Sequence, residues 1–394
     1  MDILFGIFLS LLVFSVVVFF HELGHFALAK WFGVRVEEFG IGIPPRAKKI
    51  WQDKSGTIYT FNWLPIGGFV KMKGEDMEGK GAKEKDSLVH KSFWQQSGVI
   101  LAGVFMNFLF AILIFSGLFM VGVEPLAVNT KFETVAQTKL IPSFDEAVKS
   151  WFIKTDGLLL SPLTGSIAQT SGILDNDVLL RIDGVTITKP DMMISRVKSA
   201  DKALIFEIKR GDAIKTVSIL PQDGKIGSYV GYNVTDINKD FRYKYGFFES
   251  IGEGIEETYA QSRMTLELLG TLVSKIVTPH TATDRDEAVK SLGGPIAVGN
   301  LFVGLVDAKA TLSVIIMIAA LISINLGVFN LLPFPALDGG RFFFLMINKG
   351  LSSVFGKRAL VGKIEHMIHI AGFSFLILVS IFVAYQDIVK IIFK

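Results

Sequence analysis

The sequence contains no cysteine among its 394 residues. This absence excludes disulfide bonds, thiolate metal sites and cysteine nucleophiles together. Any metal site must therefore use histidine, aspartate or glutamate side chains. Histidine is scarce as well, so the search for ligands is short: the six histidines are His21, His25, His90, His280, His366 and His369.

An excess of charge of one sign is also missing, since the formal net charge is only +3 at pH 7. This balance gives no support for nucleic-acid binding, which relies on a basic surface. Half of the residues are hydrophobic, and 34 of them are phenylalanine. Soluble domains rarely have this composition, which indicates a membrane protein in contact with the lipid bilayer.

Charged residues are absent from three long apolar stretches, residues 3–20, 99–123 and 310–337. A fourth apolar stretch covers residues 370–385 and extends to 367–386 without Asp, Glu, Lys or Arg. About 20 apolar residues span the hydrocarbon core as a helix. The sequence therefore predicts an α-helical polytopic membrane protein with four transmembrane helices.

The first stretch is expected to stay in the mature protein, although Ala27-Leu28-Ala29 resembles a signal-peptide cleavage site. Residues Met1 and Asp2 carry no positive side chain, and the apolar run is longer than that of a usual signal peptide.

Basic residues are concentrated in two connecting segments. The segment after the first stretch contains Lys30, Arg35, Arg46, Lys48, Lys49, Lys71, Lys73, Lys80, Lys83, Lys85 and Lys91. The segment before the fourth contains Lys349, Lys357, Arg358 and Lys363. The positive-inside rule places both segments in the cytoplasm. Both termini and residues 124–309 are then expected outside.

Residues 124–235 are predicted to form a β-rich extracytoplasmic domain. Strands are expected over 158–160 and 177–182, the second ending at an Asp-Gly turn, followed by a hairpin over 203–220. This order resembles a PDZ domain, which binds an extended peptide as an added strand. A β-rich spacer of another kind is the alternative.

Residues 236–309 are predicted to form an amphipathic helical linker on the same side, with apolar faces over 247–277. This helix either packs on the β-rich domain or lies on the membrane surface beside the substrate path, and the sequence leaves both possibilities open.

The first apolar stretch runs into a HExxH motif, His21–His25. Residues four apart share one face of a helix, so both imidazoles can reach one zinc ion. Glu22 lies beside the first ligand, where it can act as the catalytic base. Two histidines and a glutamate are costly at the end of a membrane helix, which favours a zinc site over a satisfied core histidine.

A catalytic zinc ion usually has three protein ligands, and Asp338 is the best candidate for the third. Pro333 and Pro335 break the helix before it, and Gly339 and Gly340 follow it. Irregular backbone at membrane depth is tolerated only where protein buries it or where it lines a wet cavity. An aspartate at a simple helix end would not explain the two prolines. The weaker candidates are Glu37, Glu38, His366 and His369.

Several motifs together resemble the site-2 protease family, and in particular its bacterial RseP/RasP group. They are His21–His25, the Gly-x-x-x-Asn of Gly103 to Asn107, and the Asn-x-x-Pro-x-Pro-x-Leu-Asp-Gly of Asn330 to Gly339; residues 33–37, 64–72 and 291–297 also match. The resemblance extends over both ends of the chain and its PDZ-like middle.

The resemblance implies a zinc metalloprotease of the bacterial inner membrane that cleaves transmembrane segments of single-span proteins. Anti-sigma factors and remnant signal peptides are among the substrates of this group. It also implies a β-hairpin over Tyr59–Met72 that dips into the membrane from the cytoplasmic side and pairs with an unwound substrate. Asn325 and Asn330 would contact the substrate backbone, whereas helix–helix hydrogen bonding is their alternative role.

The sequence departs from the family in having one clear PDZ-like unit, with residues 126–155 as a remnant of another or a first strand, and in Val104 and Arg341. Other functions were weighed against proteolysis. A membrane-anchored PDZ adaptor with a non-proteolytic zinc site would not need Glu22. A zinc transporter would need more His or Asp residues in its helices. An ordinary zincin with a membrane anchor would take its third ligand from a soluble domain, which would leave the helix break before Asp338 unexplained.

Overall fold

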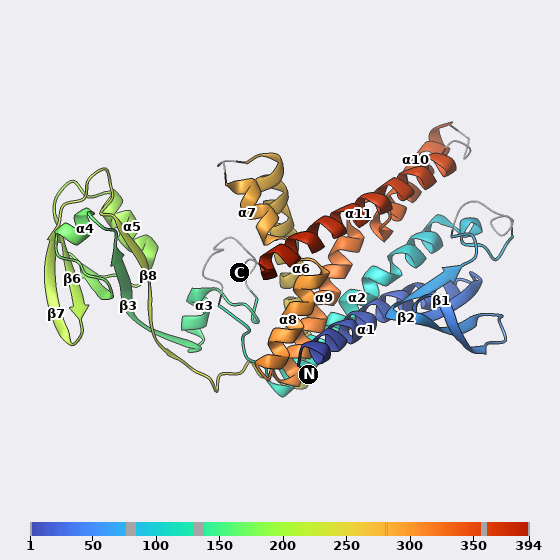
Figure 1. Cartoon of the computed structure of the whole chain (residues 1–394), viewed down its shortest axis with the longest axis horizontal. Helices are drawn as coiled ribbons and strands as arrows, with labels where there is room; N and C mark the ends of the chain where they lie inside the picture. Colours follow the sequence, from blue (N-terminus) through green and yellow to red (C-terminus); the bar gives the residue numbers. More distant parts are fainter. Residues whose placement is uncertain are drawn as a thin grey trace. The chain divides into compact units, whose positions relative to one another are not determined.

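The computed structural model describes residues 2–75, 84–128, 138–279, 281, 283–355 and 361–392 (Figure 1). They form two compact units. The described residues of the membrane unit fall within 1–126, 134–140 and 243–394, and those of the β-rich unit fall within 127–133 and 141–242.

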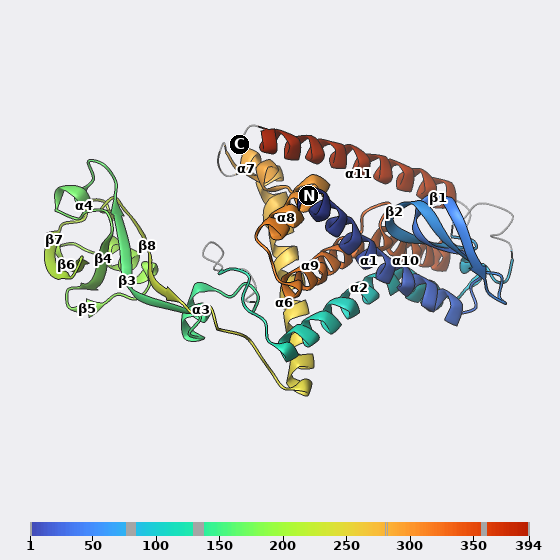
Figure 2. The same cartoon turned by 60° about the horizontal axis from the view of Figure 1, so that its bottom comes forward.

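Four helices of the membrane unit are long and apolar enough to cross a bilayer, which confirms the four predicted spans. They are α1 (Asp2–Trp31), α2 (Phe93–Val121), α9 (Leu312–Leu331) and α11 (Val361–Ile392), of which Met367–Ile391 is the spanning part. Figure 2 shows α1 and α2 side by side. Helix α1 continues past the uncharged run to Trp31, so the HExxH motif lies inside it, where Gly24 faces the backbone oxygen of Ala102 in α2.

The described residues of the membrane unit also form the helices α6 (Phe247–Val277), α7 (Asp284–Ser291), α8 (Pro295–Asp307) and α10 (Asp338–Phe355). Helix α6 packs against α2 and α9. A Cβ atom on its Gly254 would lie 2.3 Å from Ser116 Oγ, so the backbones of α6 and α2 are close. Helix α6 thus packs on two membrane helices, and its position on the membrane surface beside the substrate path stays a prediction.

Two long antiparallel strands, β1 (Val36–Gln52) and β2 (Ile58–Met72), follow α1, before the short 3₁₀ helix η2 (Leu88–His90). Both strands bend, so that four runs lie in the order 46–52, 58–62, 36–41 and 68–72. The predicted hairpin required the two arms of Tyr59–Met72 to pair with each other. They do not, because each arm pairs with residues 36–41 instead. Residues 36–41 lie between them because buried Phe39 packs against Phe19 and Phe26 of α1.

The β-rich unit contains an antiparallel sheet in the order β7-β6-β4-β3-β8, with β5 on β4. Its elements are α3 (Phe144–Lys149), β3 (Ile153–Pro162), α4 (Ile167–Thr170), β4 (Asp177–Ile182), β5 (Val185–Thr186), α5 (Pro190–Lys198), β6 (Leu204–Arg210), β7 (Ala213–Ile219) and β8 (Ser228–Ile237). Strand β4 and the β6–β7 hairpin match the sequence prediction closely. The region 126–155 contains α3 and the start of β3 among its described residues, and residues 129–137 lie outside them.

An ion pair joins the neighbouring strands β4 and β6 of this sheet. Arg210 donates from Nε and Nη2 to the two carboxylate oxygens of buried Asp177, at 2.7 and 2.6 Å, and Leu174 N–H donates to the same carboxylate. Burial opposes ionisation of Asp177, but these donors outweigh it and hold the pKa of Asp177 below its usual value. The pair keeps the ends of β4 and β6 in register.

Candidate metal centre

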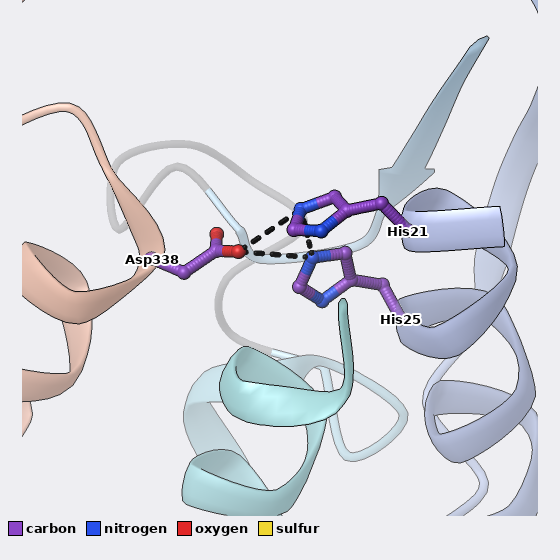
Figure 3. A group of neighbouring side chains, drawn as sticks. All are labelled: His21, His25 and Asp338. Atoms are coloured by element: carbon purple, nitrogen blue, oxygen red, sulfur yellow. Dashed lines mark hydrogen bonds and ion pairs between the residues drawn. The ribbon is translucent and has the colours of Figure 1, made fainter. Parts of the chain in front are cut away.

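Helix α1 brings two imidazoles to one point. His21 and His25 are one helical turn apart and buried, and their Nε2 atoms lie 3.2 Å from each other. Figure 3 shows both rings turned toward the same carboxylate. The spacing of the HExxH motif produces this arrangement directly, because residues i and i+4 of a helix share one face.

Helix α10 supplies the carboxylate. Asp338 is its first residue, and Asp338 Oδ2 lies 3.1 Å from His21 Nε2 and 3.3 Å from His25 Nε2 (Figure 3). The preceding residues form a tight loop after α9 ends at Leu331. This loop requires glycine at position 340. A Cβ atom there would lie 2.1 Å from the backbone oxygen of Phe334 and would clash with it. The predicted helix break thus presents Asp338 to the two histidines.

Helix α2 orients both rings from the opposite side. His25 Nδ1 lies 2.7 Å from the backbone oxygen of Val99, so it must carry the proton that it donates. The amide of Asn107 contacts His21 Nδ1 at 3.1 Å. Gly103 lies beneath the rings, where a Cβ atom would be 2.3 Å from His25 Nε2 and 2.6 Å from His21 Cε1. Only a residue without a side chain leaves room for this approach.

The three ligand atoms fit a zinc ion. Ligands about 2.0–2.1 Å from a tetrahedral zinc ion are themselves about 3.3 Å apart, and the observed separations are 3.1, 3.2 and 3.3 Å. His25 donates through Nδ1, which leaves the lone pair of Nε2 facing the centre. Asp338 Oδ2 is buried and accepts no conventional hydrogen bond within the described part of the chain. These orphaned groups are what a cation would satisfy.

Glu22 is held at the edge of this cluster by β2. The backbone N–H of Val70 donates to Glu22 Oε2 at 3.1 Å. A Cβ atom on Gly68 would lie 3.8 Å from Glu22 Cγ and 3.1 Å from the backbone oxygen of Gly40, so the strand passes close to α1. The carboxylate is therefore fixed next to the first ligand in the chain.

The other candidate ligands lie elsewhere. Glu37 pairs with Lys71 at 3.1 Å, and Glu38 pairs with Arg46 and accepts from Thr60. His369 accepts a hydrogen bond from Ala336 N–H at 2.9 Å, and the side chain of His366 is outside the described residues. Among the described side chains, the structure thus groups Asp338 with the two histidines, and not Glu37, Glu38 or His369.

The two predicted substrate-contacting residues lie on α9. Asn330 is half-buried in the last turn of this helix, and Asn325 is exposed. Thr265 Oγ1 of α6 donates to Asn325 Oδ1 at 2.8 Å. Both asparagines are on the helix that leads into the Asp338 loop.

Comparison with known proteins identifies the group that carries this site. The model of peptidase family M50 matches residues 9–380. The chain belongs to this family. Its sequence is 31% identical, over 383 residues that cover 96% of this chain and 97% of the relative, to a protein of Clostridium perfringens named as a candidate zinc metalloprotease.

Two further relatives match nearly as widely. A candidate zinc metalloprotease of Helicobacter pylori is 27% identical, with 97% of this chain and 99% of the relative covered. The regulator of sigma-E protease RseP of Escherichia coli is 27% identical, with 85% and 88% covered. The M50 membership confirms the predicted resemblance to site-2 proteases, and the chain is a zinc metalloprotease.

The sequence prediction did not give three residues around the centre the contacts that the structure shows for them. Gly103 and Asn107 appeared only as a motif shared with the family, and His369 appeared as a rival ligand. Their contacts join α1 to α2 and the Asp338 loop to α11, across long separations in the chain. The sequence feature that could have indicated the contact with α1 is the pair Gly103 and Asn107, four residues apart in an otherwise apolar stretch.

Proposed function

We propose that this M50 protease hydrolyses peptide bonds within the transmembrane segments of single-span membrane proteins. The observation that carries the proposal is the group of buried His21 and His25 with half-buried Asp338, on helices α1 and α10 of the membrane unit. A bond cleaved at this group has to reach the interior of a bundle of bilayer-spanning helices. Anti-sigma factors and remnant signal peptides are the proposed substrate classes.

His21, His25 and Asp338 would hold the zinc ion, which supplies a Lewis acid that polarises the scissile carbonyl and acidifies the attacking water. Glu22 accepts the proton of that water and passes it to the leaving amine. The N–H of Val70 keeps the Glu22 carboxylate oriented for both transfers.

Substrate binding is proposed to use the outer edge of the β1–β2 sheet. Residues 68–72 form that edge, and Val70 within it donates its backbone N–H to Glu22. An unwound substrate added there as an extra strand would satisfy its own backbone groups at membrane depth. Asn325 and Asn330 are proposed to bind the substrate backbone from α9, and Asn325 would exchange its bond from Thr265 for one from the substrate.

The same sheet is proposed to dip into the bilayer from the cytoplasmic side. Its exposed side chains include a large apolar set, which suits lipid contact: Ile41, Ile43, Ile50, Trp51, Phe61, Trp63 and Leu64. Together with the positive-inside rule, this agrees with an inner-membrane protein whose termini and β-rich unit are extracytoplasmic.

The β-rich unit is proposed to be a PDZ-like domain that admits only substrates already trimmed on the outside. Its strand β8 pairs with β3 alone among the described strands, so its other edge is open to an added strand. Excising residues 141–242 is expected to relax discrimination against untrimmed substrates while leaving cleavage of trimmed ones intact.

The excision is feasible because both ends of the unit are anchored in the membrane unit. Val123 and Tyr243 exchange backbone hydrogen bonds, and Leu140 accepts from Leu126. A short Gly-Ser linker from residue 140 to 243 preserves these bonds. Cleavage rates of a trimmed and an untrimmed substrate are compared in both proteins, and an unchanged ratio would count against the filter.

The Glu22→Gln variant tests the proteolytic mechanism. Glutamine keeps the shape of the side chain and its acceptor for Val70 N–H but cannot take the water proton. We expect the purified variant to retain one zinc ion and to cleave a model single-span substrate about 10²–10⁴-fold more slowly. Metal content and cleavage rate are measured on the same detergent-purified sample.

The alternative function makes a different forecast. If the wild type holds zinc but both forms leave a panel of trimmed single-span substrates intact, a membrane-anchored adaptor with a structural zinc site becomes the better description. A variant that cleaves at the wild-type rate would remove Glu22 from the mechanism.

A further inference from the structure

The loop that presents Asp338 is backbone-strained. Between the end of α9 at Leu331 and the start of α10 at Asp338, Ala336 has φ of 77°, in the left-handed region that favours glycine. A residue with a side chain stays in that conformation only where its surroundings enforce it. Since Ala336 is two residues before Asp338, its conformation decides where the carboxylate points.

Helix α11 supplies the enforcing contacts. The N–H of Ala336 donates to His369 Nδ1 at 2.9 Å. Close to His369 on the same helix, a Cβ atom on Gly372 would lie 2.5 Å from Pro335 Cβ and 2.7 Å from the backbone oxygen of Pro335. The backbone of α11 therefore lies directly against the loop. The contact at His369 is a hydrogen bond, and the contact at Gly372 is a close approach of the two backbones.

Two further side chains, Glu365 and Phe344, lie near the imidazole of His369. Its Nδ1 accepts from Ala336, so a neutral ring carries its proton on Nε2, which lies 3.8 Å from Glu365 Oε1. Asn348 of α10 donates to Glu365 Oε2 at 3.2 Å, and the ring of Phe344 lies 5.4 Å from the imidazole. Phe344 of α10 and Glu365 of α11 thus lie beside the imidazole whose Nδ1 accepts from the loop.

We propose that His369 is a positioning residue, which keeps the Pro335–Leu337 loop in the conformation that brings Asp338 to His21 and His25. The inference rests on the proposed zinc site. It assigns to α11 a role in metal retention, although the group of possible ligands among the described residues contains no residue of α11. A change in α11 would reach the metal through Ala336.

The test measures zinc release from the full-length protein in detergent after addition of a chelator. His369→Leu removes the acceptor and is expected to accelerate release by about 10–100-fold, the usual effect of losing a group that orients a metal ligand. His369→Asn restores an oxygen acceptor near the position of Nδ1 and is expected to release zinc within about threefold of the wild type. His90→Leu, at an exposed histidine, is the matched control and is expected to release zinc at the wild-type rate.

Ala336→Gly provides a second, independent measurement. Glycine adopts a positive φ without strain, so the loop should need His369 less. In the Ala336→Gly background, His369→Leu is expected to change the release rate by less than half of its logarithmic effect in the wild type. A merely structural loss of packing would be the same in both backgrounds.

The inference is overturned if His369→Leu releases zinc at the wild-type rate. It is also overturned if the Asn and Leu variants lose zinc equally fast, or if Ala336→Gly leaves the effect of His369→Leu unchanged. If the proposed zinc site were wrong, the result would differ from all of these. The wild type would then hold no stoichiometric zinc before any chelator is added.

Discussion

The Gly103→Ala variant is expected to lose stoichiometric zinc binding and to cleave substrate at least about 100-fold more slowly. The added methyl group would lie 2.3 Å from His25 Nε2, and 2.6 and 2.7 Å from His21 Cε1 and Nε2. Non-bonded carbon atoms normally approach to about 3.5–4.0 Å. The two imidazoles must therefore turn away from α2, and the two ligand nitrogens move apart.

A matched control lies in the same helix. Gly117 of α2 has no atom within 4 Å of the position that its Cβ would occupy, so Gly117→Ala tests the effect of the same substitution without the clash. We expect Gly117→Ala to bind one zinc ion and to cleave at the wild-type rate. Metal content is measured on purified protein, with size-exclusion elution as the check of folding. Wild-type zinc content in the Gly103→Ala variant would contradict the proposed metal site.

The local part of this site could be predicted from the sequence. His21 and His25 lie together because a helix repeats every 3.6 residues, and any helix through that segment pairs them. Asp338 could be singled out because Pro333 and Pro335 must break the helix before it. Both inferences need only the conformation of a few consecutive residues, which local chemistry largely determines.

The contacts between helices could not be predicted in the same way. The bond between Asn107 and His21 joins residues 86 apart in the chain, and it depends on how α1 and α2 are rotated about their axes. The helix amphipathicity that normally reports this rotation is absent, because apolar residues surround both helices. The register of β1 and β2 was missed for a related reason: residues 36–41 could have paired with either arm of β2, and in fact pair with both.

Hydrogen bonds of Asn107 connect three helices at the metal centre. Asn107 accepts a further hydrogen bond from Ser323 of α9 through its backbone oxygen, at 3.0 Å. The same segment of α2 thus bonds to α1 on one side and α9 on the other. Because unpaired polar groups are costly at membrane depth, such a chain of bonds specifies one arrangement of the three helices. The metal ligands are therefore aligned by the packing of the spans.

The Asp338→Asn variant tests which residue completes the zinc site. Asparagine keeps the size of the side chain and the loop that carries it, but it removes the negative charge that lies 3.1 and 3.3 Å from the two ligand nitrogens. A neutral amide is a much poorer zinc ligand than a carboxylate. We expect zinc affinity to fall by at least about 100-fold and cleavage to be lost at the zinc concentration that saturates the wild type.

The matched control removes a carboxylate that the structure places elsewhere. Glu37, which was a rival third ligand, pairs with Lys71 on the sheet, so Glu37→Gln is expected to keep wild-type zinc affinity and activity. Titration with a zinc-buffered chelator distinguishes the two variants. The opposite pattern, with Asp338→Asn retaining zinc and Glu37→Gln losing it, would require the third ligand to come from the sheet. In that case the helix break before Asp338 would serve substrate entry alone, and α10 would have no part in holding the metal.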